Sequence, residues 1–302
     1  MPKSRGRADW EIGESSADFS KDALFGVAGR AIVITGGGSG IGSMMAAGFV
    51  AQGARVYIVS RKDCSPLAAE LTARGPGRCA ALRGDVADDA DIAALVAALD
   101  AQEPRGVHAL INNAGTNFAA PIGEYPSAAW DKVYRVNTRG VFMLTQALLP
   151  ALERSAAGPG GAGTDGRTLR ACVVNIASIE ALQTPAHPTF AYSTGKAAVR
   201  HLSRVLAGKF GMDGRRVNVN SICPGPFQSR MMRVTLETVG RETVAGVTAC
   251  GRIGNPQDMA GAALYLCSPA GQYVTGASLT VDGGAVAMPH MAMSPLAGES
   301  KL

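Results

Sequence analysis

From Ala31 onward, short runs of β-branched and other apolar residues alternate with longer segments rich in alanine and leucine. Strands that alternate with helices are typical of βαβ units, in which parallel strands form one sheet that helices cover on both faces. The sequence therefore predicts an α/β protein with a Rossmann-type, doubly wound, seven-stranded parallel sheet. The expected strands are 31–35, 55–59, 79–82, 108–112, 171–177, 216–222 and 277–281.

The unbroken alternation favours one domain, which we expect to cover 29–284. The preceding residues, 1–28, are polar and are expected to form a mobile extension. A segment rich in glycine and alanine, 155–168, predicts a flexible surface loop between a helix and a strand. The residues after the last strand, 285–302, have no clear period and are expected to form a tail.

The composition argues against several classes of function. A chain of 302 residues that is 47% hydrophobic can bury a large core. Its net charge of +5 is spread out, which argues against nucleic acid as a partner. No apolar run is long enough for a membrane span and the N-terminus lacks the core of a signal peptide, so we expect a soluble intracellular protein. Six scattered cysteines without C-x-x-C pairs predict buried thiols in a reducing compartment and no metal site.

The segment TGGGSGIG (35–42) joins the first expected strand to a helix. Glycines let the backbone turn sharply and approach a pyrophosphate, while the start of the helix offers unpaired N–H groups. A simple tight turn is the alternative, but the first strand-to-helix connection is where dinucleotide sites lie. We therefore expect cofactor contacts from the following residues of this loop: Gly36, Gly38, Ser39, Gly40, Ile41 and Gly42.

The end of the second expected strand indicates which dinucleotide binds. NAD sites place an acidic residue here for the ribose hydroxyl, whereas this chain has Ser60, Arg61 and Lys62. A hydroxyl and two cations favour a 2′-phosphate, which a carboxylate would repel. A solvated basic turn is the alternative. The sequence predicts NADPH/NADP+ as the cofactor.

Tyr192 and Lys196 are four residues apart in YSTGK (192–196), inside a segment with the pattern of an amphipathic helix. Four residues are about one helical turn, so both side chains lie on one face. Taken alone, the pair is better explained by a core tyrosine beside a lysine that extends to solvent. The other motifs of the chain decide between the two interpretations.

Together these motifs resemble the single-domain short-chain dehydrogenases/reductases over 29–284. The resemblance extends to TGGGSGIG, NNAG (112–115), the serine of NIASIE, YSTGK and CPGPFQS (223–229). Within that family the chain is most similar to NADPH-dependent 3-oxoacyl (β-ketoacyl) reductases of the rhamnolipid-synthesis type. The resemblance adds these expected cofactor contacts: Asp85, Val86, Asn113, Ala114, Gly115, Tyr192, Lys196, Pro224, Gly225, Phe227 and Ser229.

Two positions depart from the family pattern. Ser39 stands where many NADP-dependent members have a basic residue, so Arg61 and Lys62 must supply the preference for phosphate. Ser229 stands where threonine is usual, although its hydroxyl is still able to donate to the nicotinamide carboxamide. The 155–168 segment and both terminal segments lie outside the shared pattern.

The resemblance implies a catalytic set of Asn137, Ser178, Tyr192 and Lys196. Tyr192 would donate a proton to a carbonyl oxygen, which Ser178 would hold by a hydrogen bond. Lys196 would bind the nicotinamide ribose, and Asn137 would hold a water that passes protons to it. A tyrosine pKa is ordinarily about 10, and we expect the Lys196 ammonium and the oxidised nicotinamide to lower it. Gly195 would keep the helix face clear either for the cofactor or for a close helix contact.

The substrate is expected between the segments that follow Ser178 and Pro224. Methionine-rich surfaces adapt to varied apolar shapes, although the same residues would also suit a helix core. Glu180 would tune specificity or face water, and we favour water. The predicted pocket residues are Ile179, Glu180, Leu182, Phe227, Met231 and Met232.

The chain ends in Ser300, Lys301 and Leu302, which is the peroxisomal address. In a eukaryote this signal predicts a peroxisomal import receptor as partner and the peroxisome matrix as location, and otherwise we expect the cytoplasm. Peroxisomes handle acyl-CoA chains, so the signal favours a 3-oxoacyl or related lipid carbonyl as substrate.

These observations predict an enzyme that reduces a small-molecule ketone to a secondary alcohol with NADPH. Reduction of small diketones, quinones or other non-fatty-acyl ketones, or of an enoyl thioester, stays an alternative, and isomerisation is possible on the same fold. A non-catalytic NADPH-binding sensor or scaffold is the least favoured interpretation. The helical segments 129–153 and 190–210 have broad apolar faces, which predict a homotetramer or a homodimer.

Overall fold

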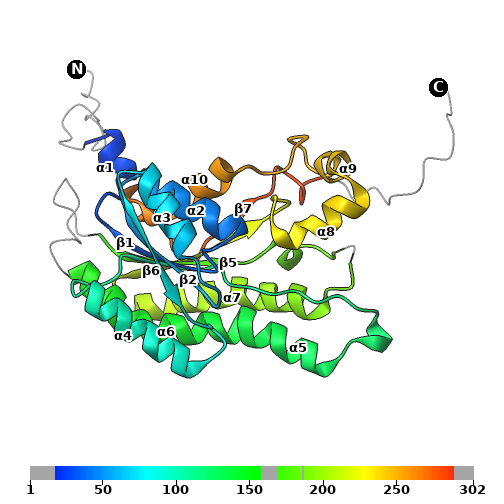
Figure 1. Ribbon diagram of the computed structural model, residues 1–302, viewed down its shortest axis with the longest axis horizontal. Coiled ribbons are helices and arrows are strands. Elements are labelled where there is room, and N and C mark those ends of the chain that lie inside the picture. The colour runs from blue at the N-terminus through cyan, green and yellow to red at the C-terminus, as the bar shows by residue number, and fades with distance from the viewer. Residues whose placement is uncertain (1–17, 158–168, 186, 289–302) are drawn as a thin grey trace, which may run out of the picture.

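Seven parallel strands form one sheet in the order β3-β2-β1-β4-β5-β6-β7 (Figure 1). The structure is a computed structural model that describes residues 18–157, 169–185 and 187–288. It confirms the predicted fold class, and the ends of all seven strands fall within two residues of the prediction. The strands are β1 (Ala31–Thr35), β2 (Arg55–Ser60), β3 (Arg78–Arg83), β4 (Ala109–Asn112), β5 (Ala171–Ile176), β6 (Val217–Pro224) and β7 (Ser278–Val281).

Helices cover both faces of the sheet (Figure 1). One layer consists of α2 (Gly40–Ala51), α3 (Ser65–Arg74) and α10 (Pro256–Cys267). The opposite layer consists of α4 (Asp89–Gln102), α5 (Ser127–Tyr134), α6 (Gly140–Ala157) and α7 (Phe190–Met212). Three further helices lie outside these layers (Figure 1), and they are α1 (Lys21–Phe25), α8 (Arg230–Val239) and α9 (Arg241–Gly246). None of the helices in the described ranges is long and apolar enough to cross a membrane.

The core has one apolar layer on each side of the sheet because successive strand residues point to opposite faces. Ile32 and Ile34 of β1 pack with Met259 of α10 in one layer. Ala31 and Val33 pack with the residues of α4, α6 and α7 in the other. Both faces of the strands are thus buried, as in parallel sheets generally.

Two predicted boundaries are wrong. The packed domain begins before the predicted residue 29, because α1 precedes that residue and Val27 is fully buried in the core. The predicted loop 155–168 begins too early, since Ser155 and Ala156 are buried in the last turn of α6. The buried Ser155 hydroxyl has a hydrogen-bond partner there, because Ser155 Oγ donates to Val107 O at 2.8 Å. The terminal Ser300, Lys301 and Leu302 lie outside the described residues.

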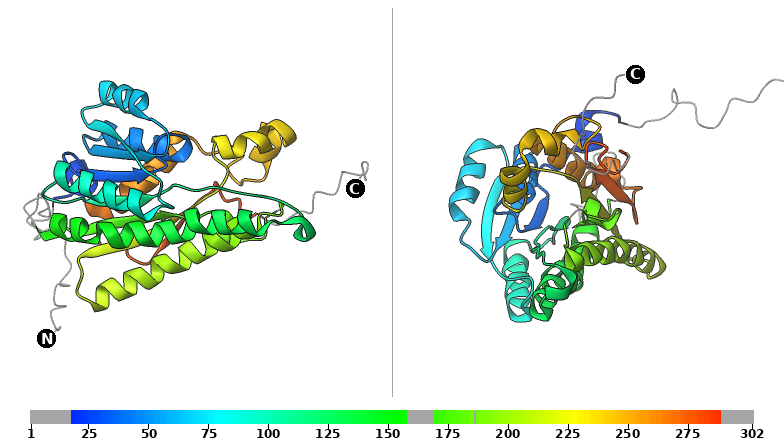
Figure 2. Two further views of the ribbon diagram at one scale, coloured as in Figure 1. Left: turned by 60° about the horizontal axis from the view of Figure 1, so that its bottom comes forward. Right: turned by 90° about the vertical axis from the view of Figure 1, so that its right-hand side faces the viewer.

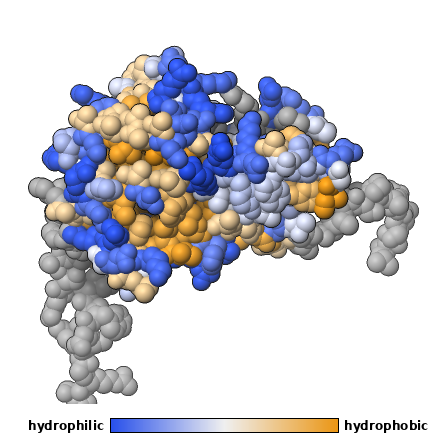
Figure 3. Space-filling view, turned by 90° about the horizontal axis from the view of Figure 1, so that it is seen from below, coloured by the Kyte–Doolittle hydropathy of each residue, from blue (hydrophilic) through white to orange (hydrophobic). Residues whose placement is uncertain are grey.

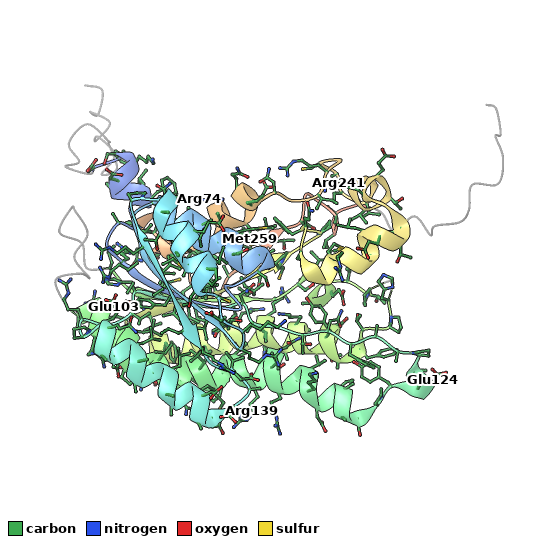
Figure 4. The ribbon with its side chains drawn as sticks, viewed as in Figure 1. Arg74, Glu103, Glu124, Arg139, Arg241 and Met259 are labelled. Atoms are coloured by element: carbon green, nitrogen blue, oxygen red, sulfur yellow. The ribbon has the colours of Figure 1, made fainter. Side chains whose placement is uncertain are left out.

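A polar network closes the end of the sheet where the strands begin. Arg55 donates to both carboxylate oxygens of Glu103, at 2.7 and 2.6 Å, and the Tyr57 hydroxyl donates to the same carboxylate at 2.7 Å. Burial first, and then the Glu103 carboxylate, raise the pKa of Tyr57 to about 12. Figure 4 places Glu103 at the end of the molecule opposite Arg241 and Glu124. The network therefore stabilises the fold far from the loops that follow the strands.

Candidate active site

The glycine loop follows β1 and opens α2. Gly36 and Gly40 have φ angles of +63° and +57°, in the left-handed region that other residues seldom adopt. A β-carbon at Gly42 would stand 2.5 Å from Asn113 Nδ2 and would also collide with the backbone carbonyl of Gly36. Ser39, the residue before α2, makes no side-chain hydrogen bond that caps the helix. The loop thus leaves backbone N–H groups and space for an anion, which fits a pyrophosphate.

The NNAG motif is fastened directly to this loop. The Asn113 side-chain amide donates to the carbonyls of Thr35 at 2.9 Å and Gly36 at 3.2 Å. The backbone N–H groups of Asn113 and Ala114 both donate to Thr35 Oγ1 at 3.0 Å. These contacts join the ends of β1 and β4, where the strand order reverses and α/β sheets bind their ligands. The sequence prediction did not include Thr35, although it is the last residue of the first strand.

The predicted phosphate residues lie together at the end of β2. Lys62 N donates to Ser60 Oγ at 3.2 Å, and the Arg61 side chain is 68% exposed. Arg61 Nη1 lies 3.8 Å from Asp85 Oδ2, which brings the predicted adenine contact to the same place. Val86, its neighbour, is buried in the core beside α4. No carboxylate occupies the end of β2 itself, so the residues present fit a 2′-phosphate.

Replacing Gly42 by alanine should weaken NADPH binding about tenfold to a hundredfold. The added methyl group would displace Asn113 from Thr35 and Gly36, and overpacking of this kind costs about 1–3 kcal/mol. Fluorescence titration with NADPH measures the change. Gly208→Ala is the matched control, since nothing lies within 4 Å of a β-carbon there. Equal affinity in the two variants would contradict the assigned role of the loop.

Ser178, Tyr192 and Lys196 come together where β5 ends and α7 begins. Their exposed fractions are 8%, 9% and 4%, so all three are buried. Lys196 Nζ lies 5.5 Å from the centre of the Tyr192 ring and donates to the carbonyl oxygen of Ile176 at 2.6 Å. The last residue of β5 thus holds the lysine beneath the tyrosine. Of the two interpretations of the Tyr192–Lys196 pair, the lysine that extends to solvent is wrong.

Asn137 occupies a π-helical turn, Arg135–Arg139, between α5 and α6. Such turns are rare and are found mostly at functional sites. The fully buried Asn137 side chain accepts from Thr116 N and donates to Thr116 O, both at 2.8 Å. A β-carbon at Gly115 would lie 3.4 Å from Asn137 Oδ1 and 3.7 Å from Lys196 Nζ. The structure therefore brings the end of NNAG, the asparagine and the lysine together.

The predicted lowering of the tyrosine pKa is wrong for the chain alone. Burial, and then the charge of Glu180, raise the pKa of Tyr192 to about 12, while the Ser178 hydroxyl opposes the rise. Burial also lowers the pKa of Lys196 to about 8. Both groups lose the hydration of their charged forms, and this desolvation is the largest cause of each shift. Tyr192 is consequently a neutral hydroxyl at pH 7.

Glu180 does not face water as expected. Its Oε2 accepts hydrogen bonds from Thr189 Oγ1 at 2.6 Å and from Ser193 Oγ at 2.7 Å. Its backbone N–H donates to Ser178 Oγ at 3.1 Å. The residue therefore connects the loop of Ser178 to the first turns of α7. The sequence signal for these partners was the i, i+4 spacing of Thr189 and Ser193 around Tyr192.

Gly195 serves a helix contact. A β-carbon there would stand 3.2 Å from Thr138 Oγ1 and 3.9 Å from Tyr134 Cε2. The close approach joins α7 to the π-helical turn that carries Asn137. Of the two roles left open for Gly195, the structure supports the packing role.

The remaining predicted pocket residues divide into two groups. Ile179, Leu182 and Met232 are half-buried, whereas the Met231 side chain lies outside the described part of the structure. The Phe227 ring is 4% exposed and packs in the core against Gly254, and its contact with substrate or cofactor stays a prediction. A hollow of about 430 Å³ lies nearby, and its lining residues are Gln228, Ser229, Arg233, Leu236 and Glu237.

The loop after β6 brings this hollow to the glycine loop. A β-carbon at Gly40 would lie 3.2 Å from Ser229 Cβ. Ser229 Oγ accepts from Met232 N at 3.2 Å and so caps α8. Pro224 is buried, and Gly225 passes so close to Asp282 that a β-carbon would stand 2.6 Å from Asp282 Cβ. The left view of Figure 2 shows α8 and α9, in yellow and gold, together at the right-hand end of the molecule.

Buried side-chain amides that the sequence analysis did not single out form hydrogen bonds between the strands and helices that carry the site. Asn112 Nδ2 donates to Thr145 Oγ1 at 3.0 Å and to Asn175 Oδ1 at 2.9 Å. Asn175 Nδ2 in turn donates to Ser203 Oγ at 2.9 Å. This chain of bonds ties β4 and β5 to α6 and α7, and its members are otherwise expected at the surface.

Among the described residues, no group of three or more His, Cys, Asp or Glu side chains is placed to hold a metal ion. The six cysteines are all free. Three are buried and two half-buried, but Cys250 is exposed, which differs from the predicted buried thiols.

Comparisons with known proteins agree with this geometry. A family model described as enoyl-(acyl carrier protein) reductase matches residues 36–286. The chain is 38% identical to the rhamnolipids biosynthesis 3-oxoacyl-[acyl-carrier-protein] reductase of Pseudomonas aeruginosa, over 86% of this chain and 97% of that one. It is 36% identical to the galactitol 2-dehydrogenase (L-tagatose-forming) of Cereibacter sphaeroides, over 86% and 96%.

A solved structure, the Pseudomonas aeruginosa RhlG/NADP active-site complex, superposes with a TM-score of 0.79 at 37% identity. The match covers 87% of this chain and 99% of that one. The shared fold, the matched length and the identities of these relatives agree with the motifs described above. The chain therefore belongs to the short-chain dehydrogenase/reductase family of oxidoreductases.

Proposed function

We propose that this protein reduces a ketone to a secondary alcohol with NADPH. The observation that carries the proposal is the burial of Ser178, Tyr192 and Lys196 together where β5 ends and α7 begins. NADPH, when bound by the glycine loop, the end of β2 and the loop after β6, supplies the hydride. The P. aeruginosa relatives support the choice of cofactor, since one of them is named as an NADP complex.

The side chains of this site have complementary roles in the reduction. The neutral Tyr192 hydroxyl donates its proton to the carbonyl oxygen of the substrate. Ser178 donates a hydrogen bond to the same oxygen, which holds it in place and stabilises the developing negative charge. The Lys196 ammonium stabilises the phenolate that remains on Tyr192. Asn137 holds the segment after NNAG next to Lys196, where a water would return a proton to the pair.

Exchanging Ser60 for aspartate should reverse the preference between cofactors. A carboxylate at the end of β2 would repel the 2′-phosphate of NADPH and would accept a hydrogen bond from the free ribose hydroxyl of NADH. We expect the ratio of kcat/KM for NADPH to that for NADH to fall at least about tenfold. Measuring both cofactors on one protein preparation controls for folding. An unchanged ratio would place the phosphate elsewhere.

The substrate proposed for the first test is a 3-oxoacyl thioester, because a relative at 38% identity is named as a 3-oxoacyl reductase. Non-fatty-acyl ketones are the second candidate, which the charge of Glu180 in the site favours. The test is NADPH oxidation with 3-oxoacyl thioesters of several lengths, small ketones, diketones, quinones and enoyl thioesters. Turnover of enoyl thioesters alone would replace ketone reduction by alkene reduction.

A homotetramer or homodimer is proposed from the outer face of α6 and α7. Phe142, Val205 and Met212 are 39%, 43% and 79% exposed there. Figure 3 shows an apolar region on this side of the molecule. Sedimentation equilibrium gives the assembly state, and a monomer at micromolar concentration would contradict the proposal.

Import into peroxisomes through Ser300, Lys301 and Leu302 stays a proposal for a eukaryotic host. Its test is the location of the chain with and without these three residues.

A further inference from the structure

Only one oxygen of the Glu180 carboxylate accepts hydrogen bonds from the described residues. Both hydroxyl donors, Thr189 and Ser193, bind the same oxygen, Oε2. No described residue donates to Oε1, and no described lysine, arginine or histidine forms an ion pair with this carboxylate. Glu180 is half-buried, and Oε1 is not one of the fully buried polar atoms that lack a partner, so a ligand is able to reach it.

The free oxygen belongs to the reaction site. Glu180 is two residues beyond Ser178 and donates its backbone N–H to the Ser178 hydroxyl at 3.1 Å. Ser193, which binds its carboxylate, directly follows Tyr192 in α7. The charge of Glu180 contributes to the raised pKa of Tyr192, which agrees with a short separation. A substrate carbonyl held by Ser178 and Tyr192 would therefore place its neighbouring atoms beside Glu180.

A structural role alone does not explain the negative charge. The two hydroxyl groups need an acceptor, and the neutral carbonyl oxygen of a glutamine would accept both bonds. Burial lowers the pKa of the nearby Lys196 ammonium and the carboxylate opposes this fall, but no described residue donates a hydrogen bond to its Oε1. A partly buried carboxylate is destabilising unless its oxygens are hydrogen-bonded. The Thr189 and Ser193 hydroxyls, which together with Glu180 form a clamp, satisfy Oε2. They leave Oε1 for a donor that comes with the ligand.

We infer that Glu180 determines specificity by accepting a hydrogen bond from the substrate, and that the preferred substrates are ketones with a hydroxyl group on the adjacent carbon. The inference rests on the proposed ketone reduction. The hydroxyl would donate to Oε1 in a charge-assisted bond, which is about twice as strong as a neutral one. A carboxylate in the same place would be repelled, and an unsubstituted carbon would leave Oε1 without a partner.

Three ketones of equal carbon number test the inference: acetoin, methyl ethyl ketone and α-ketobutyrate, which place a hydroxyl, nothing or a carboxylate beside the carbonyl. We expect the wild-type kcat/KM to be at least about tenfold higher for acetoin than for methyl ethyl ketone, and lowest for α-ketobutyrate. Glu180→Gln should reduce the ratio of kcat/KM for acetoin to that for methyl ethyl ketone about tenfold, and this ratio cancels any effect of the lost charge on Tyr192, which both ketones share. The same variant should also raise the turnover of α-ketobutyrate.

Ser193→Ala is the matched control, because it removes one bond of the clamp and keeps the charge. It should retain the acetoin preference. The inference would be overturned if Glu180→Gln lowered kcat/KM equally for acetoin and methyl ethyl ketone, or if Ser193→Ala lost the acetoin preference to the same extent. Either result would show that Glu180 only holds the Thr189 and Ser193 hydroxyls. So would a wild-type protein that reduces ketones without preferring acetoin. If no ketone of any kind is reduced, the proposed function itself fails and the inference fails with it.

Discussion

Replacing Tyr192 by phenylalanine should lower kcat for ketone reduction by about 10²–10⁴-fold, the range that a positioned general acid contributes. The substitution removes the hydroxyl that would protonate the carbonyl oxygen and keeps the ring that packs with Val133 and Ala191. Because the substitution removes one hydroxyl among the many predicted cofactor contacts, NADPH affinity should change by less than about threefold. Stopped-flow single turnovers and fluorescence titration measure the two quantities separately.

Tyr134→Phe is the matched control for this substitution. Tyr134 packs against the same small cluster and stacks on Trp130 with ring centres 5.2 Å apart. Loss of its hydroxyl should leave kcat within about twofold. If Tyr192→Phe retained most of its activity, or if both variants lost it equally, proton donation by Tyr192 would be excluded.

Replacing Lys196 by methionine should nearly abolish reduction and yet stabilise the protein at pH 7. Burial lowers the pKa of Lys196 from 10.5 to about 8, so the folded state holds the ammonium at a cost of about 3 kcal/mol. Methionine removes this cost but leaves the carbonyl oxygen of Ile176 without its donor, which costs about 1 kcal/mol or more. The free energy of unfolding should therefore rise by about 2 kcal/mol or less.

The pH dependence gives this prediction a distinctive sign. Between pH 8 and 10.5 the unfolded chain binds more protons at this lysine than the folded chain, so wild-type stability rises with pH across that window. The advantage of Lys196→Met should thus be present below about pH 8 and disappear by about pH 10. Urea unfolding at several pH values measures it, with the exposed Lys209→Met as control. If Lys196→Met were destabilised equally at every pH, burial would not be lowering the pKa of Lys196 in the folded protein.

The fold was largely predictable because each strand is a short continuous run of apolar residues that is visible in the sequence. Segments such as AIVIT consist almost entirely of β-branched residues, and the alternation of these short runs with helical segments favours buried parallel strands. Helical spacing placed Tyr192 and Lys196 on one face, but the other motifs of the chain were needed to identify them as a catalytic pair. Ser178 and Asn113 needed the family resemblance, since their roles depend on which strand ends lie side by side.

The parts that the sequence did not reveal depend on packing between distant segments. Glu180 was expected to face water because its partners, Thr189 and Ser193, belong to the next element and approach it only in the folded chain. The rise of the Tyr192 pKa could not be anticipated because desolvation follows from burial, which the spacing of two residues does not report. The packing of the Phe227 ring against Gly254 was likewise not visible in the sequence, because the two residues are 27 positions apart.

The central claim is that this chain delivers hydride to a carbonyl carbon while Tyr192 protonates the oxygen. The most direct measurement uses NADPH deuterated at its transferable position, with a panel of ketones and enoyl thioesters and mass analysis of each product. The account predicts deuterium on the carbon that bears the new hydroxyl group, and loss of that product in Tyr192→Phe. Deuterium on a former alkene carbon, or an unlabelled alcohol, would contradict it.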